Sequence, residues 1–152
     1  MSDQLQDLEE WAGLLLHRLE PAARTSLART IAQQLRRGQQ QRIQEQRNPD
    51  GSQYVPRKQR NLRGKQGRIQ RRGKMFRKLR TASFLKARPD NNVISVGFTG
   101  RIARIARVHQ YGLKDRAERG APDTRYEKRE VLGFTEENLH LIKEALLDHI
   151  TR

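Results

Sequence analysis

The feature that most restricts how this chain can fold is a long basic segment, residues 36–88, that cannot supply a hydrophobic core by itself. The segment contains 18 of the 32 Lys and Arg residues, and its acidic residues are Glu45 and Asp50, with Asp90 just past its end. The formal net charge of +15 therefore belongs to about one third of the sequence. Such an uneven charge distribution informs about partners more than about fold. We expect the core to come from the nearly neutral, amphipathic segments on either side, and the basic surface to meet a negatively charged partner.

The length and composition favour one small domain, residues 1–152, with a modest core. Hydrophobic residues make up 34% of the chain and aromatic residues 5%. A core this lean predicts a protein that gains stability from a partner or from copies of itself. The chain has no cysteine, which excludes disulfides, thiolate metal sites and thiol nucleophiles. The longest apolar runs are too short to span a bilayer and no signal-peptide pattern precedes them, so we expect a protein made in a cytoplasm without a membrane partner.

The first 47 residues predict two helices. Apolar residues recur every three or four positions from residue 3 to residue 19, which is typical of an amphipathic helix. Pro21 suits the first position of a second helix, which we expect to run to about residue 46 with Leu27, Ile31, Leu35 and Ile43 on one side. We predict that the two helices form an antiparallel hairpin and bury their apolar stripes against each other.

Residues 48–74 predict a basic, mobile arm. The sequence Asn48-Pro49-Asp50-Gly51 carries turn chemistry, and Leu62 and Ile69 are the only apolar residues of the tract 57–74. Packing cannot order such a tract by itself, so we expect it to become ordered on assembly. The predicted partner-docking or DNA-docking residues are Arg57, Lys58, Arg60, Arg63, Lys65, Arg68, Arg71, Arg72 and Lys74.

Residues 75–152 predict an α+β core. Met75, Phe76 and Leu79 suggest a short helical stripe. Residues 82–87 and 93–98 alternate as two strands around a turn, and residues 126–132 are a third candidate strand, giving a small antiparallel sheet. Residues 102–111 predict a short helix with Gly112 as its C-cap, and 113–125 a charged loop. Thr135 is placed to cap a C-terminal amphipathic helix whose buried stripe is Leu139, Ile142, Leu146 and Ile150.

The residue types argue against catalysis. The four histidines show no metal-ligand spacing with one another or with acids, and the glycines of the basic tract do not have the spacing of a phosphate-binding loop. His109 could be described as a general base, but a polar side chain that orients a helix end or faces a neighbouring subunit explains it better. We therefore predict no catalytic residue, no metal site and no cofactor, and place His109, Tyr111 and Arg129 at a subunit interface.

The basic tract leaves two partner classes open. One is duplex nucleic acid bound without sequence reading, because the aromatic residues needed to stack single-stranded bases are nearly missing from the tract. The other is an acidic protein surface, where charge steers encounter and register. A solvated loop without a partner is the third alternative, although a run this long and one-sided is more often used.

Four stretches resemble the phage tail-completion protein S, or virion morphogenesis, family. They are residues 46–58 (QRNPDGSQYVPRK), 74–79 (KMFRKL), 105–112 (IARVHQYG) and 131–135 (VLGFT), in that order. The resemblance covers almost the whole chain. The chain departs from the family pattern before Val131: Arg129 matches the usual arginine, but Glu130 replaces a proline that relatives carry, which puts the local backbone there in question.

The resemblance implies a non-enzymatic virion protein that is assembled in the host cytoplasm and acts at the head–tail junction. It further implies a ring of identical copies, for which a hexamer is one candidate, in contact with the tail tube or its terminator and with the head connector. Contact between the ring's interior and duplex DNA stays open. The alternative function is a nucleic-acid-binding accessory protein without sequence specificity.

Overall fold

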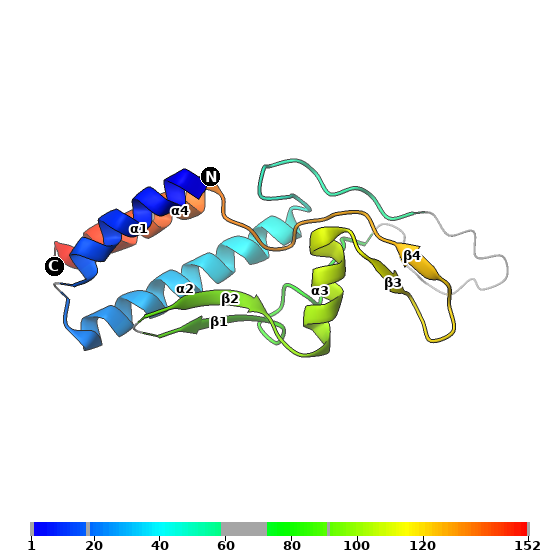
Figure 1. Cartoon of the computed structure of the whole chain (residues 1–152), viewed down its shortest axis with the longest axis horizontal. Coiled ribbons are helices and arrows are strands. Elements are labelled where there is room, and N and C mark those ends of the chain that lie inside the picture. Colours follow the sequence, from blue (N-terminus) through cyan, green and yellow to red (C-terminus); the bar gives the residue numbers. More distant parts are fainter. Residues whose placement is uncertain (1, 18, 59–72, 91, 152) are drawn as a thin grey trace.

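The computed structural model describes residues 2–17, 19–58, 73–90 and 92–151, and within them four helices and four short strands make up an α+β fold. The long helix α2 (Pro21–Gln44) runs along the molecule. The antiparallel hairpin of β1 (Leu85–Pro89) and β2 (Ile94–Phe98) packs on one side of α2, and α4 (Glu136–Ile150) packs on the other (Figure 1). Helix α1 (Ser2–Leu16) lies alongside α4. The predicted fold class is thereby confirmed.

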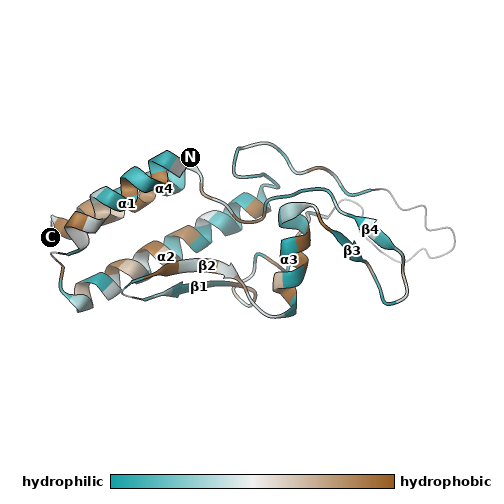
Figure 2. Cartoon of the chain, in the orientation of Figure 1, coloured by the Kyte–Doolittle hydropathy of each residue, from teal (hydrophilic) through white to brown (hydrophobic). Residues whose placement is uncertain are grey.

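Two apolar clusters hold these layers together. In the first, Leu27, Ile31 and Leu35 of α2 meet Leu146 of α4, and Ile94 and Val96 of β2 pack against this cluster, as do other half-buried residues. In the second, Ile43, Ala106 and Val131 are almost fully buried near the C-terminal end of α2. Figure 2 shows hydrophobic residues concentrated on the helices and polar residues along the loop that follows α2. Helix α2 therefore contributes to both clusters and connects them.

The short helix α3 (Arg101–Tyr111) begins directly after β2 and ends where the sequence predicts. Gly112 follows it in a left-handed conformation with φ of 63°, which glycine adopts without steric cost. At the start of α4, the Thr135 hydroxyl accepts a hydrogen bond from Asn138 N–H, and the Asn138 side chain accepts one from Thr135 N–H. Thr135 therefore caps α4 as the sequence predicts, and the Asn138 side chain completes a capping box.

The N-terminal helical hairpin is not confirmed as a packing unit. Helix α1 packs on α4, and α2 packs on α4 and on the β1–β2 hairpin. An apolar stripe must be covered, but its spacing does not say by which other element. The C-terminal helix covers both stripes here.

The predicted third strand at 126–132 is wrong. The backbone N–H groups of Glu130, Leu132 and Gly133 donate to side-chain oxygens of Asn48, Gln110 and Gln39, respectively, and not to a neighbouring strand. The second sheet lies instead in the segment predicted to be a charged loop, where β3 (Lys114–Arg116) pairs with β4 (Asp123–Arg125).

Two local predictions also need correction. Residues 75–80 form turns and not a helical stripe, and Phe76 has a left-handed φ of 64°. The first strand begins at Leu85, three residues after the predicted start. Of the described residues in the predicted arm, Tyr54 is buried in the core and only 4% exposed, whereas residues 50–53 and 55–58 are exposed. Residues 59–72 lie outside the described part of the chain, and the division of the chain at residue 74 stays a prediction.

Candidate functional site

A buried arginine near the C-terminal end of α2 is the centre of the site. Arg42 is 8% exposed, and its guanidinium donates to the carbonyl oxygens of Arg47 (3.0 Å), Glu130 (2.8 Å) and Val131 (3.1 Å) and to Gln39 Oε1 (2.6 Å). Burial lowers the pKa of Arg42 below its usual value, although the group stays charged. Because a buried charge is costly unless its donors are satisfied, these acceptors fix where the segment 130–131 lies relative to α2.

Gln39, one turn earlier on α2, extends the network to the start of α4. Its Nε2 donates to Gly133 O at 3.0 Å and to Asn138 Oδ1 at 3.5 Å, while its Oε1 accepts from Gly133 N–H at 3.2 Å. Gly133 also lies so close to Pro49 that a Cβ there would be 2.3 Å from the proline Cγ. Two stretches that carry the family resemblance, 46–58 and 131–135, therefore touch directly.

The loop 46–58 is fastened to the segment 129–130 by side chains of both. Asn48 Oδ1 accepts from Glu130 N–H at 2.9 Å, and the Tyr54 hydroxyl donates to Glu130 O at 3.1 Å. Arg129 donates to Val55 O through Nε (2.6 Å) and to Pro56 O through Nη2 (3.0 Å). A proline at position 130 could not donate the bond to Asn48, so Glu130 has a defined backbone role at the place where the sequence departs from the family pattern.

A row of aromatic rings in contact with one another borders the site on the side of α3. Phe76 contacts the rings of Tyr54 and His109 edge-on at centroid distances of 5.7 and 4.8 Å, and His109 contacts Tyr126 at 5.1 Å. Burial, followed by the nearby charges of Arg129 and Arg57, lowers the pKa of His109 to about 4. His109 is therefore neutral near pH 7, and it packs in the interior of the chain.

The three predicted interface residues have different surroundings. Arg129 is 5% exposed and bonded within the chain, His109 is half-buried, and Tyr111 is 63% exposed. Their place at a subunit interface stays a prediction. The internal bonds of Arg129 and the ring contacts of His109 could not be read from the sequence, because the partners are 17 to 74 positions away.

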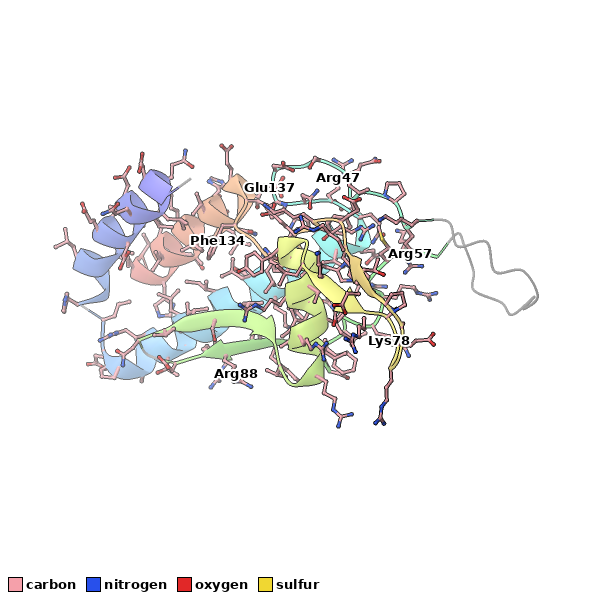
Figure 3. All side chains as sticks on the ribbon, turned by 45° about the vertical axis from the view of Figure 1, so that its right-hand side comes forward. Arg47, Arg57, Lys78, Arg88, Phe134 and Glu137 are labelled. Carbon is pink, nitrogen blue, oxygen red and sulfur yellow. The ribbon has the colours of Figure 1, made fainter. Side chains whose placement is uncertain are left out.

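Both ends of the predicted docking tract are attached near the C-terminal end of α2. Just before the tract begins, Arg129 donates hydrogen bonds to the carbonyl oxygens of Val55 and Pro56. Just after the tract ends, the Gln46 side chain accepts a hydrogen bond from Met75 N–H at 2.7 Å and donates one to Met75 O at 3.0 Å. The described residues on both sides of 59–72 are therefore bonded to the core, and Arg57 lies beyond the first of these attachments (Figure 3).

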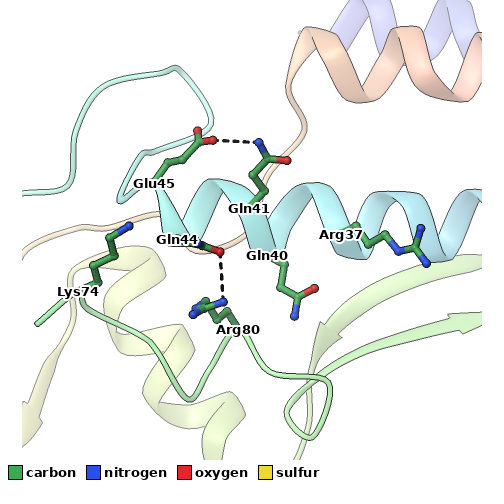
Figure 4. A pocket seen from close by; sticks show the side chains of 7 residues that line it. All are labelled: Arg37, Gln40, Gln41, Gln44, Glu45, Lys74 and Arg80. Atoms are coloured by element: carbon green, nitrogen blue, oxygen red, sulfur yellow. Dashed lines mark hydrogen bonds between the residues drawn. The ribbon is translucent and has the colours of Figure 1, made fainter.

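Three of the nine predicted docking residues can be located. Arg57, Lys58 and Lys74 are exposed. Lys74 lines a shallow groove on α2 together with Arg37, Gln40, Gln41, Gln44, Glu45 and Arg80 (Figure 4). The other predicted docking residues lie outside the described part of the chain: Arg60, Arg63, Lys65, Arg68, Arg71 and Arg72.

The groove adds cations that the sequence analysis did not assign to docking. Arg80 donates to Gln44 Oε1 at 3.3 Å, and Gln41 donates to Glu45 Oε1 at 3.0 Å, so two of the amides are already engaged. Arg37 and Arg80 belong to the same basic segment as the arm. The helical spacing of Arg37 with Gln40, Gln41 and Gln44 indicates from the sequence that they share one face of α2. Nothing in the sequence indicates that the turn at 75–80 brings Arg80 to that face.

Within the described ranges, no group of three or more His, Cys, Asp and Glu residues is arranged to hold a metal ion. None of the helices in the described part of the chain is long and apolar enough to cross a membrane.

Comparison with known proteins gives these contacts a family context. Residues 3–151 match the phage virion morphogenesis family. The chain belongs to that family. It is 40% identical over 139 residues to the tail completion protein S of Escherichia phage P2, and the match covers 91% of each chain. No solved structure matches.

The family resemblance therefore rests on residues that shape the fold. Asn48, Tyr54 and Gly133 lie in the stretches that carry the resemblance, Arg129 precedes the last of them, and all four make contacts inside the chain. Their contacts fix the loop 46–58 against the segment 129–133.

Proposed function

We propose that this chain is a structural phage protein that completes the tail and joins it to the head. The observation that carries the proposal is the 40% identity to a tail completion protein, which extends over 91% of both chains. A match of that length includes the loop 46–58, the α3 region and the segment 129–135, which together make the polar network around Arg42. We infer that the role is carried by binding surfaces and not by catalysis.

The attachment of the basic tract supports a docking role. Arg129 and Gln46 fix the two ends of the tract on the core, and Arg57, Lys58 and Lys74 are exposed beside those ends. A cationic segment held at both ends can meet an acidic surface while its attachment stays in register. The proposed partners are acidic surfaces of the tail tube or its terminator and of the head connector.

We further propose that copies of the chain form a ring at the head–tail junction of the virion. Contacts of head-to-tail type close into rings when the rotation per subunit allows it. The basic tract would then reach neighbours above or below the ring, or duplex DNA in its interior. The number of copies, with a hexamer as one candidate, belongs to the same proposal.

The test is complementation of a phage that lacks its tail-completion gene. Exposed docking residues are neutralised together as Arg57→Gln, Lys58→Gln and Lys74→Gln. We expect heads and tails to accumulate unjoined, as seen by electron microscopy and by a fall in infectious particles. Joining at the wild-type level would refute the docking role of these residues.

A matched control neutralises three exposed cations elsewhere, with Lys86→Gln, Arg88→Gln and Lys114→Gln. Joining should be unaffected by this control. If both triple variants fail equally, total charge and not position is responsible. Failure of the wild-type chain itself to restore joining would refute the proposed function.

The competing function is binding to nucleic acid without sequence specificity, and the net charge of +15 favours it. If the docking residues neutralise about 6–10 phosphates, affinity for duplex DNA should fall roughly 10³–10⁵-fold between 50 and 200 mM salt. Should the triple variant lose DNA binding but still join heads to tails, the tract serves DNA and the docking assignment is wrong.

A further inference from the structure

Helix α1 presents an acidic and apolar face to solvent. Asp7, Glu10, Trp11 and Leu14 recur at three- and four-residue spacing and are all exposed, with Trp11 37% and Leu14 76% exposed. Leu8, on the other side of the helix, is buried. There is no Lys or Arg between Ser2 and Leu16 to balance the acids. A leucine this exposed beside an exposed tryptophan indicates a surface that is covered in the assembled state.

Helix α3 presents the opposite combination. Arg101, Arg104, Arg107 and Tyr111 recur at three- and four-residue spacing, and Ile105 flanks them. All are exposed, Ile105 by 44% and Tyr111 by 63%. Arg104 pairs with Asp115.

Two of these arginines have no acidic partner of their own. Within the described part of the chain, Arg101 and Arg107 form no ion pair. Each face thus has apolar side chains next to charges of one sign, and the two signs are opposite.

The two faces lie on different parts of the molecule. Helix α1 lies on the layer formed with α4, whereas α3 stands beside the opposite end of α2, next to β2 (Figure 1). A two-fold symmetric contact through either face would bring like charges together, whereas a contact of one face with the other brings opposite charges together. Charge complementarity therefore favours a head-to-tail arrangement of identical chains.

We propose that the outward face of α1 in one copy docks on the outward face of α3 in the next copy. The proposal rests on the proposed function in one respect, because it assigns the surfaces of the self-contact that a ring requires. Trp11 and Leu14 would cover Ile105 and Tyr111, while Asp7 and Glu10 would meet Arg101 and Arg107. The register of the two helices follows from these pairs.

The expected association is weak and sensitive to salt. Helix α1 has 15 residues and α3 has 11, which gives lengths of about 22 and 16 Å. A contact of two short helices is small compared with a stable interface. Its ion pairs are open to solvent, so raising the salt concentration should weaken the association.

Charge reversal in the full chain tests the contact. One variant carries Asp7→Arg and Glu10→Arg, and the other carries Arg101→Glu and Arg107→Glu. Sedimentation velocity over a range of protein concentrations should show association at least about tenfold weaker for each variant alone. Mixing the two variants should restore association, because each then offers the other a complementary face.

A control reverses two exposed cations on β1, Lys86→Glu and Arg88→Glu, and should associate as the wild type does. Circular dichroism confirms that each variant is folded. A wild-type chain that stays monomeric at the highest concentration, unchanged association in both reversal variants, or no restoration on mixing would overturn the proposal.

Complementation separates this contact from the proposed function. If the reversal variants associate normally and also join tails to heads, the surface assignment is wrong while the function stands. If the wild type associates through these faces but does not join tails to heads, the contact stands and the function is wrong.

Discussion

Replacing Arg42 with methionine removes the guanidinium around which the polar network is built. Four acceptors lose a charged donor: three backbone carbonyl oxygens, on Arg47, Glu130 and Val131, and Gln39 Oε1. Methionine has a similar length and an unbranched stem, so the packing around the site changes little. The loss of stability therefore measures mainly the cost of leaving these acceptors without the Arg42 donor.

The size of the effect follows from these contacts. A hydrogen bond to a charged group contributes about 1.5–3 kcal/mol, and contributions from neighbouring bonds are not additive. Glu130 O retains the Tyr54 hydroxyl as a donor. We therefore expect Arg42→Met to lower the free energy of unfolding by about 3–5 kcal/mol, a large part of the roughly 5–15 kcal/mol that holds a domain of this kind folded.

Urea unfolding followed by circular dichroism measures this change. Arg37→Met, an exposed position on the same helix, should change the free energy by no more than about 0.5 kcal/mol. If Arg42→Met does not fold, Arg42→Lys keeps the charge but loses the forked geometry and should show about half the effect. A loss below about 1 kcal/mol for Arg42→Met would refute the reasoning that this network holds the segment 129–133.

Three further predictions concern the same network. Gly133→Ala should destabilise by about 1–3 kcal/mol in urea unfolding, because its Cβ would be 2.3 Å from Pro49 Cγ; a neutral change would mean that the loop moves freely. Glu130→Pro removes the N–H that bonds Asn48 and should cost about 1 kcal/mol, whereas Glu130→Gln should not. The pKa of His109 is lowered to about 4 in the folded chain, so the folded state binds fewer protons than the unfolded state. The free energy of unfolding should therefore be independent of His109 titration above about pH 6.5 and fall between pH 6.5 and 4 by up to about 1.4 kcal/mol per pH unit. In urea unfolding at a series of pH values, His109→Phe should flatten that slope.

The elements that the sequence predicts well are those with local signals. Pro21 marks the start of α2, Gly112 ends α3, and Thr135 caps α4. In each case, the residue acts on backbone groups within one turn of itself, so its effect does not depend on the rest of the fold. The β1–β2 hairpin is similar, because the Asp90 side chain accepts from Asn92 and Val93 N–H inside the turn.

The elements that the sequence does not predict depend on distant partners. The stretch 126–132 alternates like a strand, yet the N–H groups of Glu130 and Leu132 donate to side chains of the loop at residue 48 and of α3. The pairing of α1 with α4 joins segments more than a hundred residues apart. Periodicity describes which face of an element is apolar, and the identity of its partner is decided only by the packing of the whole chain.

The candidate site shows the same division for charge. Arg42 and Arg57 both belong to the basic segment 36–88, but Arg42 is buried and bonded to carbonyl oxygens while Arg57 is exposed. Counting charges in the sequence treats the two alike. Since a buried arginine that bonds its own chain cannot meet a partner, the proposed docking surface is smaller than the basic segment. Arg42 and Arg129 instead bond the backbone beside the exposed cations, which is why we expect loss of either to disturb the proposed docking without removing a contact to the partner.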